Sequence, residues 1–211
     1  MGLKHHPKVI TNGMIIYYDF ANTRSYSGSG ITINNLFSGY GCTTVNGPAF
    51  SSDNFGYLIF DGTNDYGQFS LPNLTSWSFS FWIYNHTVPV TEKQLLSTYF
   101  DYTGLSMVNS KYHIWNGSSN SGNAAIAQST WTNVVFTNTG FSSSSIYING
   151  ALDRTFGTGN QIASGDAQLL AINGTQRNHQ ANLGLFMAYN RALSLTEIFQ
   201  NYNATKRRYG K

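Results

Sequence analysis

Apolar and polar residues alternate with a period of two along much of the chain. In residues 77–84 every second side chain from Trp77 to Ile83 is large and apolar, and Ser78 and Ser80 lie between them. Successive side chains of a β-strand point to opposite faces, so this alternation predicts a strand with one face in a core. Similar short segments, rich in aromatic and β-branched residues, are predicted to be strands at residues 14–20, 56–60, 111–115, 131–138, 145–149, 168–172 and 182–189.

Turn residues separate these segments at short intervals. Asn-Gly occurs at residues 12–13, 46–47, 116–117, 149–150 and 173–174, and Asp-Gly at 61–62. Because both residues tolerate a positive φ, Asn-Gly between apolar segments is a strong hairpin signal, clearest in residues 145–156. Many short strands with almost no helix predict an all-β fold, an antiparallel two-sheet β-sandwich. The Ser- and Gly-rich segments 117–122 and 142–145 are expected to be loops.

One short helix is expected near the C-terminal end. Ser194 and Glu197 form the Ser-x-x-Glu pattern of a capping box. Leu195, Ile198, Phe199 and Tyr202 follow at helical spacing. We therefore divide the chain into an N-terminal arm (1–13), a sandwich domain (14–205) and a basic C-terminal tail (206–211).

The composition is that of a folded chain without disulfides. Only 10% of the 211 residues are charged, whereas 14 are Tyr, 14 are Phe and 4 are Trp. A disordered chain has the opposite balance. The single cysteine, Cys42, excludes an internal disulfide and is expected to be a buried apolar residue.

Positive charge gathers at the two ends of the chain. Residues 9–205 carry six basic and nine acidic residues, a net charge of −3, while the ends are purely basic. Such ends can bind an acidic neighbour, or they can simply be solvated. We expect assembly contacts at Lys4, Lys8, Lys206, Arg207, Arg208 and Lys211. Binding to nucleic acid is not favoured, because no face combines aromatic and basic residues.

No targeting segment is visible in the sequence. The opening residues 1–7 have no apolar stretch of the kind found in a secretory signal. The longest apolar runs are too short to span a bilayer. We therefore expect synthesis in a cytoplasm and no insertion into a membrane.

Five blocks then stand out in order. They are residues 60–66 (Phe-Asp-Gly-Thr-Asn-Asp-Tyr), 77–83 (Trp-Ser-Phe-Ser-Phe-Trp-Ile), 131–137 (Trp-Thr-Asn-Val-Val-Phe-Thr), 146–150 (Ile-Tyr-Ile-Asn-Gly) and 189–194 (Tyr-Asn-Arg-Ala-Leu-Ser) with Glu197-Ile198. Together they resemble laminin-G-like domains of the concanavalin A-like lectin and glucanase superfamily. The resemblance implies a jelly-roll sandwich.

The two ends of the chain resemble a narrower group. Residues 19–30, 200–204 and 207–210 are similar to the ends of laminin-G-like proteins from phage genomes. This resemblance implies a protein of the virion, with other virion proteins and copies of itself as partners. The chain departs from that group at residues 33–39, where a Trp is missing and Asn35 replaces an Asp. It departs again at residues 180–182, where relatives carry a Gly.

Catalytic patterns are missing from the sequence. Hydrolysis of a glycosidic bond uses two carboxylates, and the chain has only two glutamates, Glu92 and Glu197, far apart in sequence. Its histidines, at positions 5, 6, 86, 113 and 179, lack the spacing of a zinc site. We expect a protein that is not an enzyme and requires no cofactor.

Calcium is the one metal that the resemblance suggests, because laminin-G-like domains often bind Ca²⁺ at the rim of the sandwich. Calcium takes six to eight oxygen ligands, carboxylates among them. The candidates are Asp61, Asp65, Asp19 and Asn22. The alternative is that these side chains only cap turns.

Sugar binding would use exposed aromatic rings together with amide and imidazole groups. The candidates are Trp115 with Asn116, Tyr99, Tyr102, and Asn178 with His179 and Gln180. The alternative for a tryptophan in a strand is burial in the core. We therefore expect a non-enzymatic structural protein of a bacteriophage virion, a capsid decoration or a fibre- or tail-associated module that contacts glycans on the host surface. The alternative is a carbohydrate-binding adhesin, and a glycoside hydrolase is the least favoured.

Overall fold

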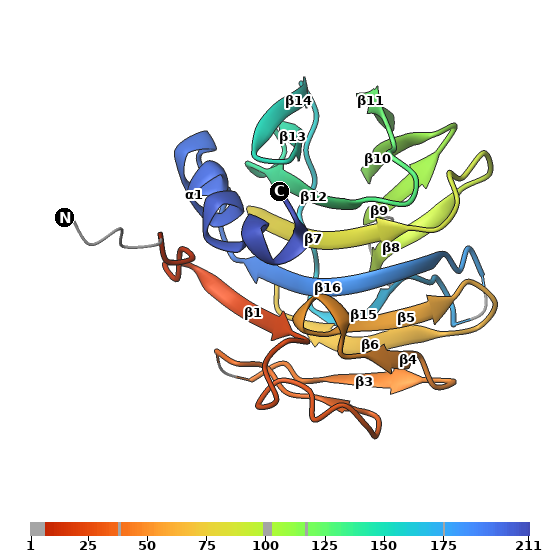
Figure 1. The fold of residues 1–211 in the computed structure, drawn as a ribbon. Coiled ribbons are helices and arrows are strands. Elements are labelled where there is room, and N and C mark those ends of the chain that lie inside the picture. Colours follow the sequence, from red (N-terminus) through yellow and green to blue (C-terminus); the bar gives the residue numbers. More distant parts are fainter. Residues whose placement is uncertain (1–6, 38, 99–102, 117, 175) are drawn as a thin grey trace.

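The chain folds into two antiparallel sheets that pack face to face (Figure 1). The computed structural model describes residues 7–37, 39–98, 103–116, 118–174 and 176–211. Sheet A has the order β14 (Ala151–Phe156), β13 (Ser144–Ile148), β12 (Trp131–Asn138), β7 (Trp77–Asn85), β16 (Gln180–Tyr189), β5 (Tyr57–Asp61) and β4 (Ala49–Ser51), and β1 (Met14–Asp19) also pairs with β16. Sheet B has the order β11 (Ser119–Ala125), β10 (Lys111–Asn116), β9 (Thr103–Val108), β8 (Lys93–Thr98), β15 (Gly165–Leu169), β6 (Tyr66–Leu71), β3 (Cys42–Val45) and β2 (Thr32–Ile33). The predicted two-sheet sandwich is confirmed.

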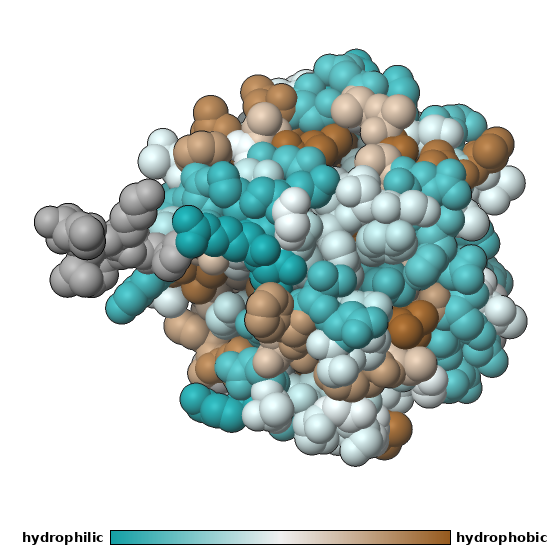
Figure 2. Space-filling model, in the orientation of Figure 1, coloured by the Kyte–Doolittle hydropathy of each residue, from teal (hydrophilic) through white to brown (hydrophobic). Residues whose placement is uncertain are grey.

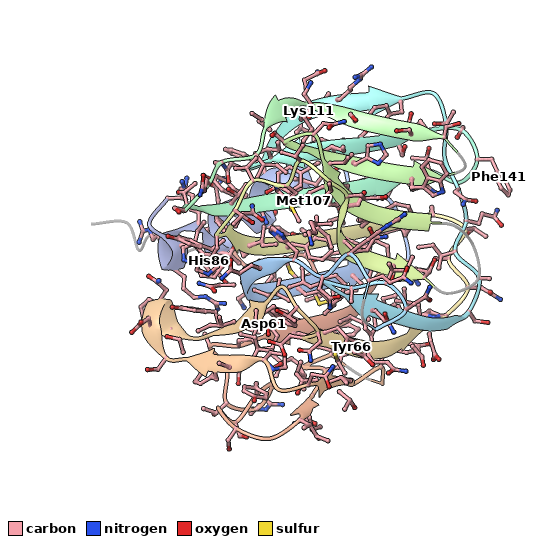
Figure 3. All side chains as sticks on the ribbon, turned by 90° about the vertical axis from the view of Figure 1, so that its right-hand side faces the viewer. Asp61, Tyr66, His86, Met107, Lys111 and Phe141 are labelled. Carbon is pink, nitrogen blue, oxygen red and sulfur yellow. The ribbon has the colours of Figure 1, made fainter. Side chains whose placement is uncertain are left out.

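The space between the sheets is filled largely by aromatic rings. Phe186 on β16 lies 5.0 Å from Phe81, 5.8 Å from Tyr18 and 5.9 Å from Phe69, measured between ring centroids. These rings come from both sheets, so their burial holds the two layers together. In an end view, Met107 of sheet B lies near the centre of the molecule (Figure 3). The alternation in residues 77–84 is confirmed, because Trp77, Phe79, Phe81 and Ile83 all belong to this core.

The outer face of sheet A is covered as well, which the alternation did not predict. Trp82 points away from the main core yet is fully buried, because the C-terminal helices pack over it. These are α1 (Leu195–Thr205) and the 3₁₀ helix η2 (Lys206–Tyr209), and a further 3₁₀ turn, η1 (Asp53–Phe55), precedes β5. Seen from this side, the surface is mostly hydrophilic, with scattered apolar groups (Figure 2).

The capping box of the helix is confirmed. Ser194 Oγ accepts the N–H of Glu197, and the Glu197 carboxylate accepts the N–H of Ser194. Arg191 donates to both oxygens of the same carboxylate, at 2.9 and 2.6 Å, and lowers the pKa of Glu197 to about 2. Of the four apolar residues at helical spacing, Ile198 is buried, whereas Leu195 and Phe199 are about half exposed.

Several strands carry no local signal and were not predicted. The expected loop at 117–122 is wrong in part, because β11 begins at Ser119. Its Ser-, Asn- and Gly-rich sequence forms a strand because backbone pairing with β10 holds it, and because Asp153 accepts the N–H groups of Asn123 and Ala124. The strand expected at 168–172 is shifted, since β15 ends at Leu169.

Both chain ends pack against the sandwich where the structure describes them. Gln200 donates to the carbonyl of Lys8, and Asn201 accepts the N–H of Ile10. In the tail, Tyr209 is buried and Arg208 forms an ion pair with Asp19 at 2.6 Å. Residues 206–211 are therefore part of the folded body.

Candidate functional site

Trp115 lies on the outer face of sheet B, and part of its ring is open to solvent. In β10, Tyr112 and Ile114 point into the core, so Trp115 points outward with His113. The side chain of Trp115 is 39% exposed, whereas Trp77, Trp82 and Trp131 are buried. The alternative reading of Trp115 as a core residue is therefore wrong.

A hollow of about 320 Å³ opens beside Trp115. Glu92, Gln94 and Arg177 line it, and Arg177 forms an ion pair with Glu92 at 2.8 Å. Gly104 of β9 lies directly beside Trp115 in the sheet register. The site thus joins an apolar ring to carboxylate, amide and guanidinium groups from separate parts of the chain.

Polar atoms without hydrogen-bond partners lie in and beside this hollow. Gln94 is almost fully buried, and its Oε1 has no hydrogen-bond partner. Ser106 and His113 are its neighbours on the same face of the sheet, and Ser106 Oγ and His113 Nδ1 are likewise buried without partners. Burial lowers the pKa of His113, with a smaller opposing effect from Glu92. Unpaired buried polar atoms cost stability, and these three lie together on one face of sheet B.

A second hollow of about 380 Å³ adjoins the first on sheet B. Ser97 and Ile172 line both hollows. The far side of the second hollow is formed by Tyr66, Gln68 and Gln168. Tyr66, labelled in Figure 3, is the first residue of β6 in sheet B. The two hollows form one surface groove across sheet B.

Three of the predicted sugar-binding residues do not form an exposed cluster. Asn178 and His179 are buried, and only Gln180 is exposed. His179 Nε2 donates to Asn85 Oδ1 at 2.9 Å, and Asn85 donates to the Tyr112 hydroxyl. Because Asn178 and His179 are buried, they cannot form hydrogen bonds with a sugar bound at the surface.

The predicted calcium ligands are divided between two places. Asp61 pairs with Gln180 at one end of β16, whereas Asp19 pairs with Leu185, five residues further along that strand. Asp61 Oδ1 accepts the N–H groups of Thr63 and Asn64, which lowers the pKa of Asp61. Burial raises the pKa of Asp65.

Asp19 and Asn22 serve local contacts at their own end of the sandwich. The carboxylate of Asp19 binds Arg208 and the N–H of Ala21, and Asn22 accepts the N–H of Arg24. Within the described ranges, no group of three or more His, Cys, Asp or Glu side chains is arranged to hold a metal ion. The four residues therefore do not fit a single calcium site.

The predicted assembly residues lie in different environments. Lys8, Arg207 and Lys211 are exposed, while Lys206 lies over the ring of Tyr202. Arg208 donates hydrogen bonds to the carboxylate of Asp19, to the carbonyl of Gly184 and to the Tyr209 hydroxyl. Arg208 is thus a structural residue.

Some predicted residues cannot be placed. Lys4, Tyr99 and Tyr102 lie outside the described residues, and Asn116 is placed only as the last residue of β10. Sequence reasoning missed Gln94, Gly104 and Arg177. The only local signal was that Arg177 directly precedes the candidates at 178–180.

With the fold and the groove described, the sequence can be compared with known families. The family model of the concanavalin A-like lectin/glucanases superfamily matches residues 61–199. The chain belongs to this superfamily. No curated protein sequence matches it. None of the helices in the described part of the chain is long and apolar enough to cross a lipid bilayer.

Several solved structures resemble most of the sandwich. The receptor-binding domain of botulinum neurotoxin type G aligns with a TM-score of 0.68 and 18% identity, over 90% of this chain and 51% of that one. Trypanosoma rangeli sialidase aligns with a TM-score of 0.71 and 14% identity, over 96% and 34%. Domain 4 of the arabinanase AbnA from Geobacillus stearothermophilus, solved with arabinotriose, gives 0.68 and 14%, over 90% and 98%. The chain spans about half of the toxin domain, and at these identities the likeness shows the fold alone.

Proposed function

We propose that the chain is a non-catalytic glycan-binding domain whose binding site is the groove at Trp115. The observation that carries this proposal is the contrast among the four tryptophans, of which Trp115 is the one with an open ring, beside a polar hollow. An exposed aromatic ring leaves apolar surface in contact with water unless a partner covers it. The apolar face of a sugar ring fits such a partner, and the neighbouring amide, carboxylate and guanidinium groups suit its hydroxyls.

The carboxylates of the groove support binding without hydrolysis. Glycosidases place two carboxylates on opposite sides of the scissile bond. Within the described residues, the hollow at Trp115 is lined by one carboxylate, Glu92, which pairs with Arg177, and the adjoining hollow by one other, Asp166. The other glutamate of the chain, Glu197, is occupied by the helix cap and by Arg191.

A glycan array with three variants tests this proposal. Trp115→Ala should abolish binding to every glycan that the unmodified chain retains, and Trp115→Phe should keep part of it. Phe141→Ala, which removes another exposed aromatic ring, is the matched control and should bind normally. The array is run with calcium and with EDTA, since calcium at Asp61 and Asp65 remains a prediction. Retained binding by Trp115→Ala, or binding to no glycan at all, contradicts the proposal.

The place of the domain is a second part of the proposal. We infer from the phage-like ends of the sequence that it is carried on a virion, as a capsid decoration or a fibre- or tail-associated module, and that it contacts other virion proteins or copies of itself. We expect the exposed basic residues Lys8, Arg207 and Lys211 to take part in such contacts. Mass spectrometry of purified particles tests this part: the chain should be present in a fixed number of copies, and its absence overturns the virion role.

A further inference from the structure

We propose that the groove on sheet B takes an internal stretch of a linear, uncharged glycan, which lies across the strands. This inference rests on the proposed glycan-binding function and names its ligand class. It is carried by the sheet register, by the two adjoining hollows and by the charges along their walls.

The sheet register places one row of outward positions under the groove. Trp115 on β10 pairs with Gly104 on β9, which pairs with Ser97 on β8. Ser97 pairs with Gln168 on β15, which pairs with Gln68 on β6. Neighbouring strands lie about 4.8 Å apart, so the row from Trp115 to Gln68 spans about 19 Å. Since the strand spacing is close to the length of one pyranose ring, the row matches a chain of several sugar units.

Each end of the row offers an aromatic ring. Trp115 stands in the first hollow, and Tyr66 lines the second. A single terminal sugar would use only one hollow, whereas a ligand that passes over Ser97 and Ile172 uses both. The groove therefore favours a chain over a single terminal unit.

The floor between the rings offers hydrogen bonds without obstruction. Gly104 has no side chain, and an added Cβ would lie 2.7 Å from Gln94 Nε2. The glycine thus leaves room for the Gln94 amide to lie across the strand beside Trp115. Gln94 Oε1 is buried without a partner, so a ligand hydroxyl would reach it only once the amide turns toward the groove.

The charges of the groove exclude an acidic sugar. Among the described residues, the charged side chains that line the two hollows are Glu92, Arg177 and Asp166, which together carry a net charge of −1. Arg177, the one cation in this described lining, is paired with Glu92. A uronic or sialic acid would meet this pair and the second carboxylate with no free cation to bind it, and repulsion would weaken its binding.

Isothermal titration calorimetry with oligosaccharides of increasing length tests this inference. Arabinose, glucose, galactose and N-acetylglucosamine oligomers of one to six units serve as probes, each with a uronate-bearing counterpart. For the series that binds, affinity should rise about tenfold or more from two to four units and then level off. The uronate counterpart should bind more weakly. Gln68→Ala should weaken binding of the tetramer but leave the dimer unchanged, and Gln161→Ala, outside the groove, should change neither.

The outcomes separate this inference from the proposed function. A monosaccharide that binds as tightly as its tetramer, or equal binding of the acidic counterpart, overturns the inference while Trp115-dependent binding survives. If Gln68→Ala has no effect on the tetramer, the second hollow takes no part and the inference is wrong. If no probe binds and Trp115→Ala changes nothing, the proposed function fails together with it.

Discussion

The phenol ring of Tyr209 stacks on the indole ring of Trp82, with centroids 4.2 Å apart and ring planes 17° apart. Tyr209 lies in the last turn of the chain, and Trp82 lies at the centre of sheet A. Trp131 contacts the same phenol ring at 4.8 Å. The stack explains how both faces of β7 are buried although only one faces the other sheet.

Tyr209→Ala should therefore destabilise the whole domain, by about 3 kcal/mol, because it leaves a cavity over Trp82. Lys211→Ala is the control in the same segment, and its exposed side chain donates a hydrogen bond to Thr130. It should change the free energy of unfolding by less than about 0.5 kcal/mol. Urea unfolding monitored by tryptophan fluorescence measures both. Equal stability of the two variants would contradict a structural role for the tail.

Acid should weaken the fold through His179. Burial, with smaller effects of Lys93 and His86, lowers the pKa of His179 to about 4. The unfolded chain protonates this group near its ordinary pKa of 6.5, while the folded chain resists protonation. Stability from this group is thus complete above about pH 6.5 and is lost as the pH falls toward 4, by about 3 kcal/mol at most.

His179→Gln serves as the comparison for this acid effect. Its amide can still donate to Asn85 but does not titrate over this range. Urea unfolding at several pH values between 4 and 7 should show a smaller pH dependence in the variant. The same slope in both proteins would show that His179 is not the responsive group.

Asp153 should hold the two sheets together at one edge. Its carboxylate on β14 of sheet A accepts the N–H groups of Asn123 and Ala124 on β11 of sheet B, at 2.8 and 2.9 Å. In Asp153→Ala, water replaces the carboxylate at these exposed donors, so only the net hydrogen bonds are lost, which should cost about 1 kcal/mol. Hydrogen exchange at these two amides should quicken. In Asp166→Ala, an exposed carboxylate on β15, both amides should exchange as in the unmodified chain.

The sequence predicts those features of the fold that depend on residues close together in the chain. The alternation in residues 77–84 placed Phe79 and Phe81 in the core, and the Ser194–Glu197 pair placed the start of α1. The exposure of Trp115 was also accessible from its strand, because Tyr112 and Ile114 occupy the inward positions on either side of His113.

The groove could not be predicted in this way. Glu92 and Arg177 meet beside Trp115 only because β8, β9 and β10 pair in a particular register. The polar run 178–180 appeared suited to the surface, but the fold turns His179 inward toward Asn85, a partner on β7. Such pairings join distant parts of the chain, and no local pattern encodes them.

The most direct test of the account is to map the ligand on the folded chain by NMR. The amide shifts of the ¹⁵N-labelled protein are recorded while the best-binding oligosaccharide is added. The groove predicts the largest changes at Gly104, Ser97 and Gln168, together with the indole N–H of Trp115. Changes confined to the rim around Asp61 and Gln180, with the sheet B amides unmoved, would contradict it.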